Sequence, residues 1–129
     1  MNGRFLLDTN IIIALFQRDT SVQENIAQTE QVFVSSTVVG ELYYGAYKSG
    51  RVTANLTRIE EFVAKTAVLE CDLVTAQQYG EIKNFLREKG RPIPENDIWI
   101  AAVTKQYELT LVSRDKHFSE IDGLFLASW

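Results

Sequence analysis

Short apolar runs alternate with longer stretches of helical periodicity along the whole chain, and this alternation limits the folds that are possible. The runs combine apolar and β-branched residues, are typical of strands, and occupy residues 4–8, 32–36, 67–71, 110–115 and 124–128. Strands that are separated by helices pair in parallel, through right-handed crossovers that place helices on both faces of the sheet. The sequence therefore predicts an α/β fold.

The stretches between these runs predict helices over residues 9–17, 21–30, 37–48, 52–65, 73–89 and 95–107. Ser21 and Glu24 have the spacing of a capping box at the start of the second helix. Gly90 and Pro94 match the usual stop and start signals of the last two helices. In open parallel sheets, ligands bind beyond the carboxyl ends of the strands, so polar residues at those ends are the first candidates for a functional site.

The length of 129 residues is enough to enclose one hydrophobic core, so we expect residues 1–129 to form a single domain. The formal net charge of −4 argues against a general basic surface for nucleic acid, because phosphate binding requires clustered Lys and Arg side chains. Any contact with nucleic acid must therefore be local.

Cys71 is the only cysteine, so an intramolecular disulfide is impossible. Its apolar surroundings predict a small buried side chain, and a single thiol fits a reducing, cytoplasmic location. No segment approaches the roughly 20 apolar residues that are needed to cross a bilayer. We therefore expect a soluble protein without a membrane contact.

Carboxylates follow several of the predicted strands. Asp8 ends the run at residues 4–8 and Asp115 ends the run at residues 110–115, so parallel pairing would bring both acids to one edge of the sheet. Asp8 could equally cap the helix that follows it. Asp72 also lies after a strand and before a helix, so position alone does not separate these acids.

Two further acids lie within predicted helices. Glu41 is the only charge between Val38 and Tyr47 on a helix that is apolar nearly all round, so it either occupies a narrow strip facing water or serves a site. Asp97 lies in the first turn of its helix, where an acid stabilises the macrodipole by about 0.3–1 kcal/mol. Large apolar residues follow it directly and could direct it inward, although capping is the expected role for Asp97 taken alone.

Four segments, "LLDTN", "GELYYG", "NDIWIAA" and "LVSRDKHFSEIDGLFLASW", resemble the four signature stretches of PIN domains. The resemblance is greatest to the VapC toxins of bacterial and archaeal toxin–antitoxin pairs, and it runs from residue 4 to the carboxyl terminus. It implies a three-layer α/β/α sandwich around a central, mainly parallel sheet of about five strands. It also implies a metal-dependent endoribonuclease whose catalytic, metal-binding acids are Asp8, Glu41, Asp97 and Asp115.

The same resemblance implies roles for neighbouring residues and partners. Thr9, Asn96 and Ser113 match polar positions that support the acidic cluster, and Asp72 remains a helix cap. The expected cofactor is Mg²⁺ or Mn²⁺, because such hard cations prefer carboxylate oxygens. The expected partners are an RNA substrate, a small VapB-like antitoxin that masks the site, and a second copy of the chain in a homodimer formed through helices.

Basic residues accompany two of these acids despite the acidic total charge. One group precedes Asp97 in the sequence, and another flanks Asp115. The candidates for RNA binding are Arg87, Arg91, Arg114 and Lys116. An ordinary solvated helix face, with i,i+4 pairs involving Lys83, is the alternative for the first group.

His117 is the only histidine, which disfavours a metal-free ribonuclease that uses two imidazoles as acid and base. A zinc site is disfavoured as well, because zinc needs three or four His or Cys ligands. We therefore expect His117 to be an ordinary surface residue.

The aromatic segment around Glu41 has two possible uses. Leu42, Tyr43, Tyr44 and Tyr47 could belong to the core or to an interface with another chain. The core is the expected location for most of them.

Two alternative functions remain at this stage. A haloacid-dehalogenase-like aspartyl phosphotransferase or phosphatase also places a nucleophilic Asp after its first strand, but it usually needs a second Asp two positions later, where this chain has Asn10. A non-catalytic PIN-like module would bind RNA or protein through its surface and would not need the acids.

Overall fold

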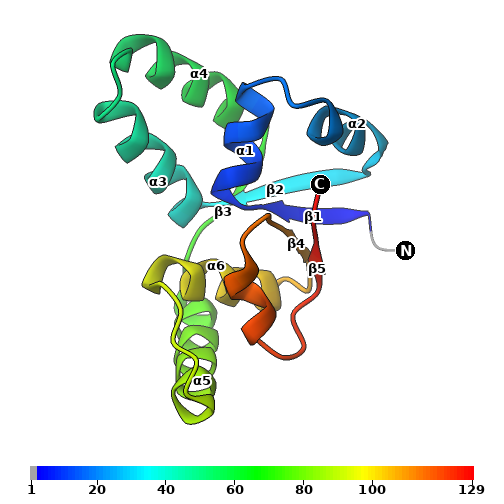
Figure 1. The fold of residues 1–129 in the computed structure, drawn as a ribbon, viewed down its shortest axis with the longest axis vertical. Coiled ribbons are helices and arrows are strands. Elements are labelled where there is room, and N and C mark those ends of the chain that lie inside the picture. Colours follow the sequence, from blue (N-terminus) through cyan, green and yellow to red (C-terminus); the bar gives the residue numbers. More distant parts are fainter. Residues whose placement is uncertain (1–2) are drawn as a thin grey trace.

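A five-stranded sheet runs through the centre of the computed structural model, which describes residues 3–129 (Figure 1). Its strands are β1 (Arg4–Leu7), β2 (Gln31–Ser35), β3 (Ala67–Leu69), β4 (Thr110–Val112) and β5 (Leu126–Ala127). Their order is β3-β2-β1-β4-β5, and every neighbouring pair is parallel. The predicted α/β fold with a five-stranded parallel sheet is therefore confirmed.

Helices cover both faces of this sheet (Figure 1). They are α1 (Thr9–Phe16), α2 (Thr20–Gln28), α3 (Ser36–Tyr47), α4 (Val52–Ala64), α5 (Leu73–Lys89) and α6 (Glu95–Gln106), together with the 3₁₀ helix η1 (Lys116–Glu120). Figure 1 shows α1 to α4 on one side of the sheet and α5, α6 and η1 on the other. The result is the predicted α/β/α sandwich.

The core lies where β1 and β4 meet the helices on both sides. Leu6 on β1 pairs in register with Phe33 on β2 and Leu111 on β4, and all three side chains are buried. Helix α6 is buried along most of its length, from Asp97 to Thr104 apart from Trp99. Burying one large apolar side chain stabilises the fold by about 1.5–3 kcal/mol, so this core gives the adjoining strand ends a rigid base.

The start of α2 differs from the prediction. Asp19 is the N-cap, and its carboxylate accepts a hydrogen bond from the Val22 N–H at 3.2 Å, so the predicted capping box of Ser21 and Glu24 is wrong. Asp19 also binds Arg114 at 3.0 Å, a contact between residues far apart in the sequence. The cap itself is local, because Asp is a preferred N-cap residue, whereas the ion pair with Arg114 is not visible in a local pattern.

Two predictions about burial are also wrong. Cys71 is exposed, because it follows β3, which is an edge strand, and its Sγ lies 3.7 Å from the Thr37 Oγ1. Tyr44 and Tyr47 are 67% and 65% exposed, because they lie on the face of α3 opposite to its buried residues. Leu42 alone of this aromatic segment is fully in the core, and Tyr43 packs against it partly buried.

None of the helices in residues 3–129 is both long enough and apolar enough to span a membrane.

Candidate active site

The site lies at the carboxyl ends of β1 and β4, where the strand order reverses. The chain leaves β1 toward β2 and later returns to β4 on the other side, which opens the crevice in which ligands bind in sheets of this kind. Asp8 directly follows β1, and its backbone N–H donates to the Val112 carbonyl at 3.0 Å. This hydrogen bond extends the pairing of β1 with β4 by one residue, so it fixes the backbone of Asp8 relative to β4.

Asp8 is a helix cap and a member of the acidic cluster at once. One carboxylate oxygen accepts the Thr9 backbone N–H at 2.8 Å, at the N-cap of α1. The other accepts the Ser113 hydroxyl at 2.7 Å. Its residue is only 5% exposed, so both oxygens are held in fixed directions.

Ser113 joins the ends of the two strands. Its hydroxyl donates to Asp8 and accepts the Asp115 backbone N–H at 2.9 Å. The Asn10 side-chain amide lies 3.5 Å from the same hydroxyl, and its oxygen accepts the Arg114 N–H at 3.2 Å. Asn10 therefore serves as a link between the first helix and the turn after β4.

Glu41 reaches the site from α3. One of its carboxylate oxygens accepts the Thr9 hydroxyl at 2.7 Å, and the other accepts the Asn96 side-chain amide at 3.4 Å. These contacts come from α1 and α6, so Glu41 points toward the crevice and does not occupy an isolated solvent-facing strip. Thr9 and Asn96 thus orient the carboxylate that they were predicted to support.

Asp97 lies in the first turn of α6 with its side chain only 12% exposed. His117 contacts it: the imidazole Nδ1 lies 3.2 Å from Asp97 Oδ2 and 3.0 Å from Asp115 Oδ1. The His117 backbone N–H also donates to Asp115 Oδ1 at 2.9 Å. His117 therefore lies at the surface as expected, but it is not an ordinary surface residue, because the turn of η1 folds the ring back between two acids. Its position two residues after Asp115 was the only signal in the sequence.

Burial and mutual repulsion make the ionised acids costly. Burial raises the pKa of Asp97 to about 6, the negative charges of Asp8 and Asp115 add to the rise, and the contact with His117 opposes it. Burial also raises the pKa of Asp8, and its bonds from Ser113 and Thr9 oppose that rise. Glu41 and Asp115 repel the Asp8 charge. A cation would relieve this repulsion.

Asp72 provides the contrast. It caps α5 in a capping box with Thr75 and accepts the Gln106 side-chain amide at 2.9 Å. These bonds, first of all that from the Thr75 backbone, lower the pKa of Asp72. The predicted assignment of Asp72 to a helix cap is confirmed, and its environment stabilises a lone carboxylate without a cation.

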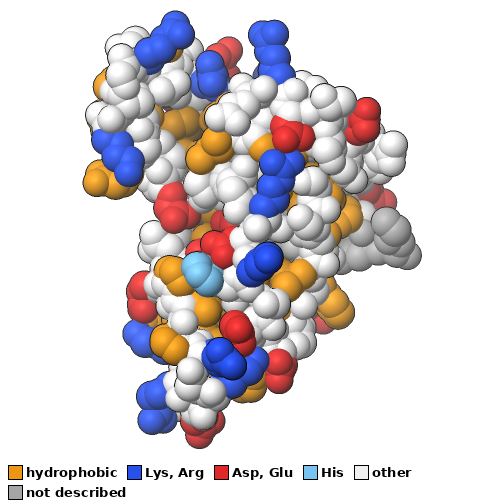
Figure 2. Space-filling view, in the orientation of Figure 1, with side chains coloured by type: hydrophobic (Ala, Val, Ile, Leu, Met, Phe, Trp, Pro, Cys, Tyr) orange, Lys and Arg blue, Asp and Glu red, His pale blue; other side chains and the backbone are white. Residues whose placement is uncertain are grey.

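The donor atoms of the cluster suit a divalent cation. In residues 3–129, one ligand atom from each of Asp97, Asp115 and His117 lies within 4.8 Å of the others. Figure 2 shows acidic side chains gathered at the centre of this face, with the histidine beside them. Carboxylates of this kind are the ligands that Mg²⁺ and Mn²⁺ prefer.

The predicted RNA-binding cations have different surroundings. Arg114 donates to Asp19 at 3.0 Å and to the Trp129 carbonyl at 2.8 Å, so its guanidinium links the start of α2 to the carboxyl-terminal segment. Arg91 and Lys116 are exposed. Arg87 is exposed as well and donates to the Asn84 side-chain oxygen at 2.7 Å.

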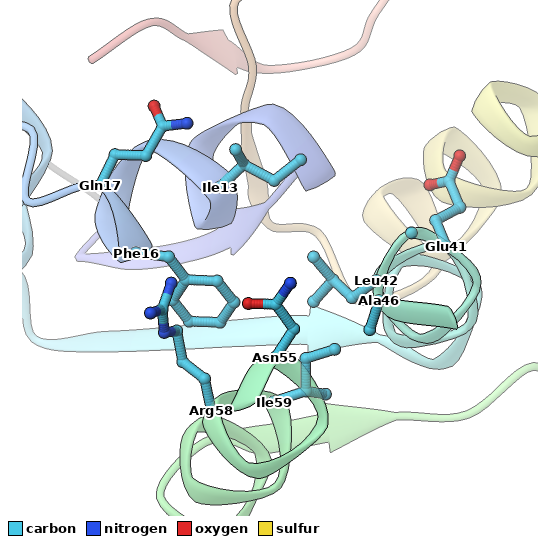
Figure 3. A pocket seen from close by; sticks show the side chains of 10 residues that line it. Ile13, Phe16, Gln17, Glu41, Leu42, Ala46, Asn55, Arg58 and Ile59 are labelled. Carbon is cyan, nitrogen blue, oxygen red and sulfur yellow. The ribbon is translucent and has the colours of Figure 1, made fainter. Parts of the chain in front are cut away.

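A cavity of about 280 Å³ adjoins the cluster between α1, α3 and α4 (Figure 3). Figure 3 shows Glu41 at one end of this cavity and Phe16 and Arg58 at the other. Its walls are largely apolar and include Ile13, Phe16, Leu42, Ala46 and Ile59. Glu41 therefore belongs both to the acidic cluster and to the rim of an apolar cavity.

The sequence matches the PIN domain family over residues 5–124. It is 36% identical to a Haemophilus influenzae protein named ribonuclease VapC2 over 98% of both chains. It is 34% identical to the tRNA(fMet)-specific endonuclease VapC of Shigella flexneri, again over 98% of both. The structure is similar to a chain in the crystal structure of VapBC2 from Rickettsia felis bound to a promoter DNA fragment, with a TM-score of 0.90, 30% identity and 98% of each chain covered.

Proposed function

We propose, from the premise that this chain belongs to the PIN domain family and to its VapC ribonucleases, that it is a metal-dependent endoribonuclease and the toxin of a toxin–antitoxin pair. One observation supports this proposal above the others: Asp8, Glu41, Asp97 and Asp115 converge from four segments of the chain and repel one another in a partly buried crevice. Such an arrangement costs stability unless a cation is bound.

Asp8, Asp97 and Asp115 would hold Mg²⁺ or Mn²⁺, which would activate a water molecule and neutralise the scissile phosphate. Glu41 would orient that water and accept its proton, and the hydrogen bonds from Thr9 and Asn96 that fix both of its oxygens support this role. The hydrogen bonds of the Ser113 hydroxyl hold the Asp8 side chain and the backbone of Asp115 in fixed relative positions. Attack of the water oxygen on phosphorus would form a new P–O bond and break the bond from phosphorus to one ribose oxygen, which would leave and take up a proton from solvent.

Cleavage of structured RNA by the purified protein tests this function. Initiator tRNA is the first substrate to use, because the Shigella relative is named for it. With Mg²⁺ or Mn²⁺ we expect cleavage that EDTA stops and that Asp8→Asn lowers by about 100-fold or more, because a lost metal ligand removes several kcal/mol of charge stabilisation. The matched control is Asp72→Asn, which keeps a capping residue and should cleave like the wild type.

Two outcomes would contradict the proposal. Cleavage that survives both EDTA and Asp8→Asn would exclude metal-dependent chemistry at these acids. RNA binding without cleavage by the wild type would favour the non-catalytic module. The phosphotransferase alternative lacks the second aspartate, and Asn10 in that position is bonded to Ser113 and Arg114.

From the acidic cluster, a bound RNA strand would extend along α5 and the start of α6. Gly80, Lys83, Asn84 and Arg87 lie on one face of α5 and line a cavity of about 710 Å³. Glu95 and Ile98 complete its wall on either side of Asp97. Lys83 forms an ion pair with Glu95 at 3.2 Å, so its charge is neutralised. Within residues 3–129, Arg87 bonds only to the neutral side chain of Asn84, so its charge is available to a phosphate.

Arg87→Glu is therefore expected to weaken RNA binding at least about tenfold, because it removes one charged hydrogen bond of about 1.5 kcal/mol and adds a carboxylate that repels phosphate. Fluorescence anisotropy in EDTA measures binding without cleavage, and the slope of log affinity against log salt should fall by about one unit. Arg51→Glu is the matched control, because Arg51 is an exposed arginine at the start of α4. Equal weakening by both variants would show a general charge effect and would remove Arg87 from the RNA site.

The antitoxin would bind in the cavity of Figure 3. That cavity offers apolar walls to a helix or strand of a partner, and Glu41 at its end would accept a cationic side chain. A partner in this position would cover an acid of the site, which accounts for inhibition. The Rickettsia relative is a VapBC complex, which supports an antitoxin partner for this chain.

A homodimer would use the exposed apolar side chains of α3 and α5. Tyr44, Tyr47, Leu73 and Val74 are between 46% and 76% exposed. The contact between Thr37 and Cys71 brings the starts of these two helices together, and Tyr44 lies on the same face of α3 as Thr37. Exposed apolar clusters of this kind mark interaction surfaces, and a twofold axis would pair two copies of the same patch.

A further inference from the structure

The imidazole of His117 contacts two of the four carboxylates, Asp97 and Asp115, and the proposed function gives this ring no role. We propose that the His117 Nδ1 is itself a metal ligand, together with Asp97 and Asp115, and that it makes the centre selective for a transition-metal ion such as Mn²⁺ over Mg²⁺. This inference rests on the proposed metal-dependent function and concerns which ion the site prefers.

The spacing of the donor atoms supports a shared ion. Two neighbouring ligands of an octahedral ion with bonds of about 2.1 Å lie roughly 3.0 Å apart. The His117 Nδ1 lies 3.0 Å from Asp115 Oδ1 and 3.2 Å from Asp97 Oδ2, so both pairs match such neighbours. A single ion could therefore bind all three groups without a large movement of the backbone.

The turn of η1 holds the ring in this position. Asp115 caps the turn and accepts the His117 backbone N–H, so the acid and the histidine are fixed relative to each other. Phe118, the next residue, is fully buried and anchors the turn in the core. The Lys89 side chain on α5 donates a hydrogen bond to the Glu120 carbonyl at 2.7 Å, which holds the end of η1 in place. About half of the His117 side chain remains exposed, so ions can approach the ring from solvent.

The chemistry of a nitrogen ligand gives the selectivity. Mg²⁺ prefers oxygen ligands and keeps several of its waters, so an imidazole adds little to its binding. Divalent transition-metal ions accept nitrogen ligands, with an affinity that is lowest for Mn²⁺ and rises through Fe²⁺ and Co²⁺ to Cu²⁺. A centre of two carboxylates and one imidazole should therefore bind Mn²⁺ more tightly than a centre of carboxylates alone, with a much smaller effect on Mg²⁺.

The Mn²⁺ dissociation constant can be measured on the whole chain without RNA. Mn²⁺ is titrated with protein, and the loss of the electron paramagnetic resonance signal of the free ion reports binding. His117→Gln is the matched variant, because its amide can still donate to both carboxylates, while the metal-binding atom that it offers is a carbonyl oxygen, which suits Mg²⁺ as well as Mn²⁺. We expect His117→Gln to raise the Mn²⁺ dissociation constant about 10- to 100-fold. The Mg²⁺ constant, obtained by competition, should change by a much smaller factor.

Isotope labelling provides a test that needs no variant. His117 is the only histidine, so ¹⁵N-labelled histidine marks one imidazole in the protein. Pulsed electron paramagnetic resonance of bound Mn²⁺ should show a nitrogen coupling that changes with this label. Mn²⁺ binding with no such coupling, or with equal affinity in wild type and His117→Gln, would overturn the inference and leave the carboxylate site intact. Absence of any Mn²⁺ binding by the wild type would overturn the proposed function as well.

Discussion

Asp97→Asn is expected to abolish RNA cleavage and at the same time to stabilise the metal-free protein. Loss of the carboxylate removes several kcal/mol of charge stabilisation in the transition state, which corresponds to a rate about 100- to 1000-fold lower. The stability gain has a separate cause, because burial raises the pKa of Asp97 from 3.8 to about 6 in the folded protein. Asparagine has the same shape and carries no charge, so it removes this cost.

The stability gain depends on pH in a defined direction. Between pH 4 and pH 6 the unfolded chain releases the Asp97 proton while the folded chain keeps it, so the free energy of unfolding of the wild type falls as pH rises through this range. A pKa shift of this size corresponds to a stability gain of at most about 3 kcal/mol in the variant. Asparagine also makes a weaker contact with His117, which reduces the expected gain to roughly 1–2 kcal/mol. The gain should be complete at pH 7.5 and absent near pH 4.

Urea unfolding in EDTA at pH 4, 6 and 7.5 measures this difference between Asp97→Asn and the wild type. Cleavage is measured in parallel with Mn²⁺ present. A variant that is less stable than the wild type at pH 7.5 would show that Asp97 is a structural residue. Retained cleavage would exclude it from the catalytic acids.

Divalent metal is expected to raise the melting temperature by about 10 °C. An ion at 100 times its dissociation constant stabilises the folded state by about 2.7 kcal/mol, and each kcal/mol shifts a domain of this size by roughly 4 °C. The physical reason is that a cation relieves the repulsion among Asp8, Glu41, Asp97 and Asp115. Differential scanning fluorimetry with Mg²⁺ or Mn²⁺, reversed by EDTA, measures the shift.

The controls for the thermal shift use two of the acids that follow strands, Asp8 and Asp72. Asp8→Asn should reduce the shift, because it removes one ligand and one repelling charge, and it should also raise the melting temperature of the metal-free protein. Asp72→Asn should show the full shift of the wild type, because Asp72 belongs to a capping box on α5. A melting temperature that millimolar metal leaves unchanged would contradict a shared cation site.

The parallel sheet was predictable because its information is local. Each strand is a short apolar run, and the connections between β1, β2, β3 and β4 contain predicted helices, so the order of these elements requires parallel pairing. The connection to β5 contains only η1, which the sequence did not predict. The same logic placed Asp8 and Asp115 at one edge, and the structure links them through Ser113. It could not separate Asp8 from Asp72, because that distinction depends on which strand is central: β1 lies in the middle of the sheet and β3 at its edge.

Two of the errors involve contact between distant segments. Arg114 binds the Asp19 side chain that caps α2, and His117 joins the acids because η1 folds toward α6. Neither contact leaves a periodic pattern in the sequence. The roles of the four acids, the RNA-binding residues and the single domain over residues 1–129 stay predictions.

The central claim is that four acids distant in the sequence bind a common divalent cation. Crystals soaked in manganese chloride, with diffraction recorded near the manganese absorption edge, test it most directly. We predict an anomalous difference peak within about 2.5 Å of carboxylate oxygens from Asp97 and Asp115, with Asp8 and Glu41 directed at the same ion or its waters. Anomalous peaks elsewhere on the protein, and none between these acids, would contradict it.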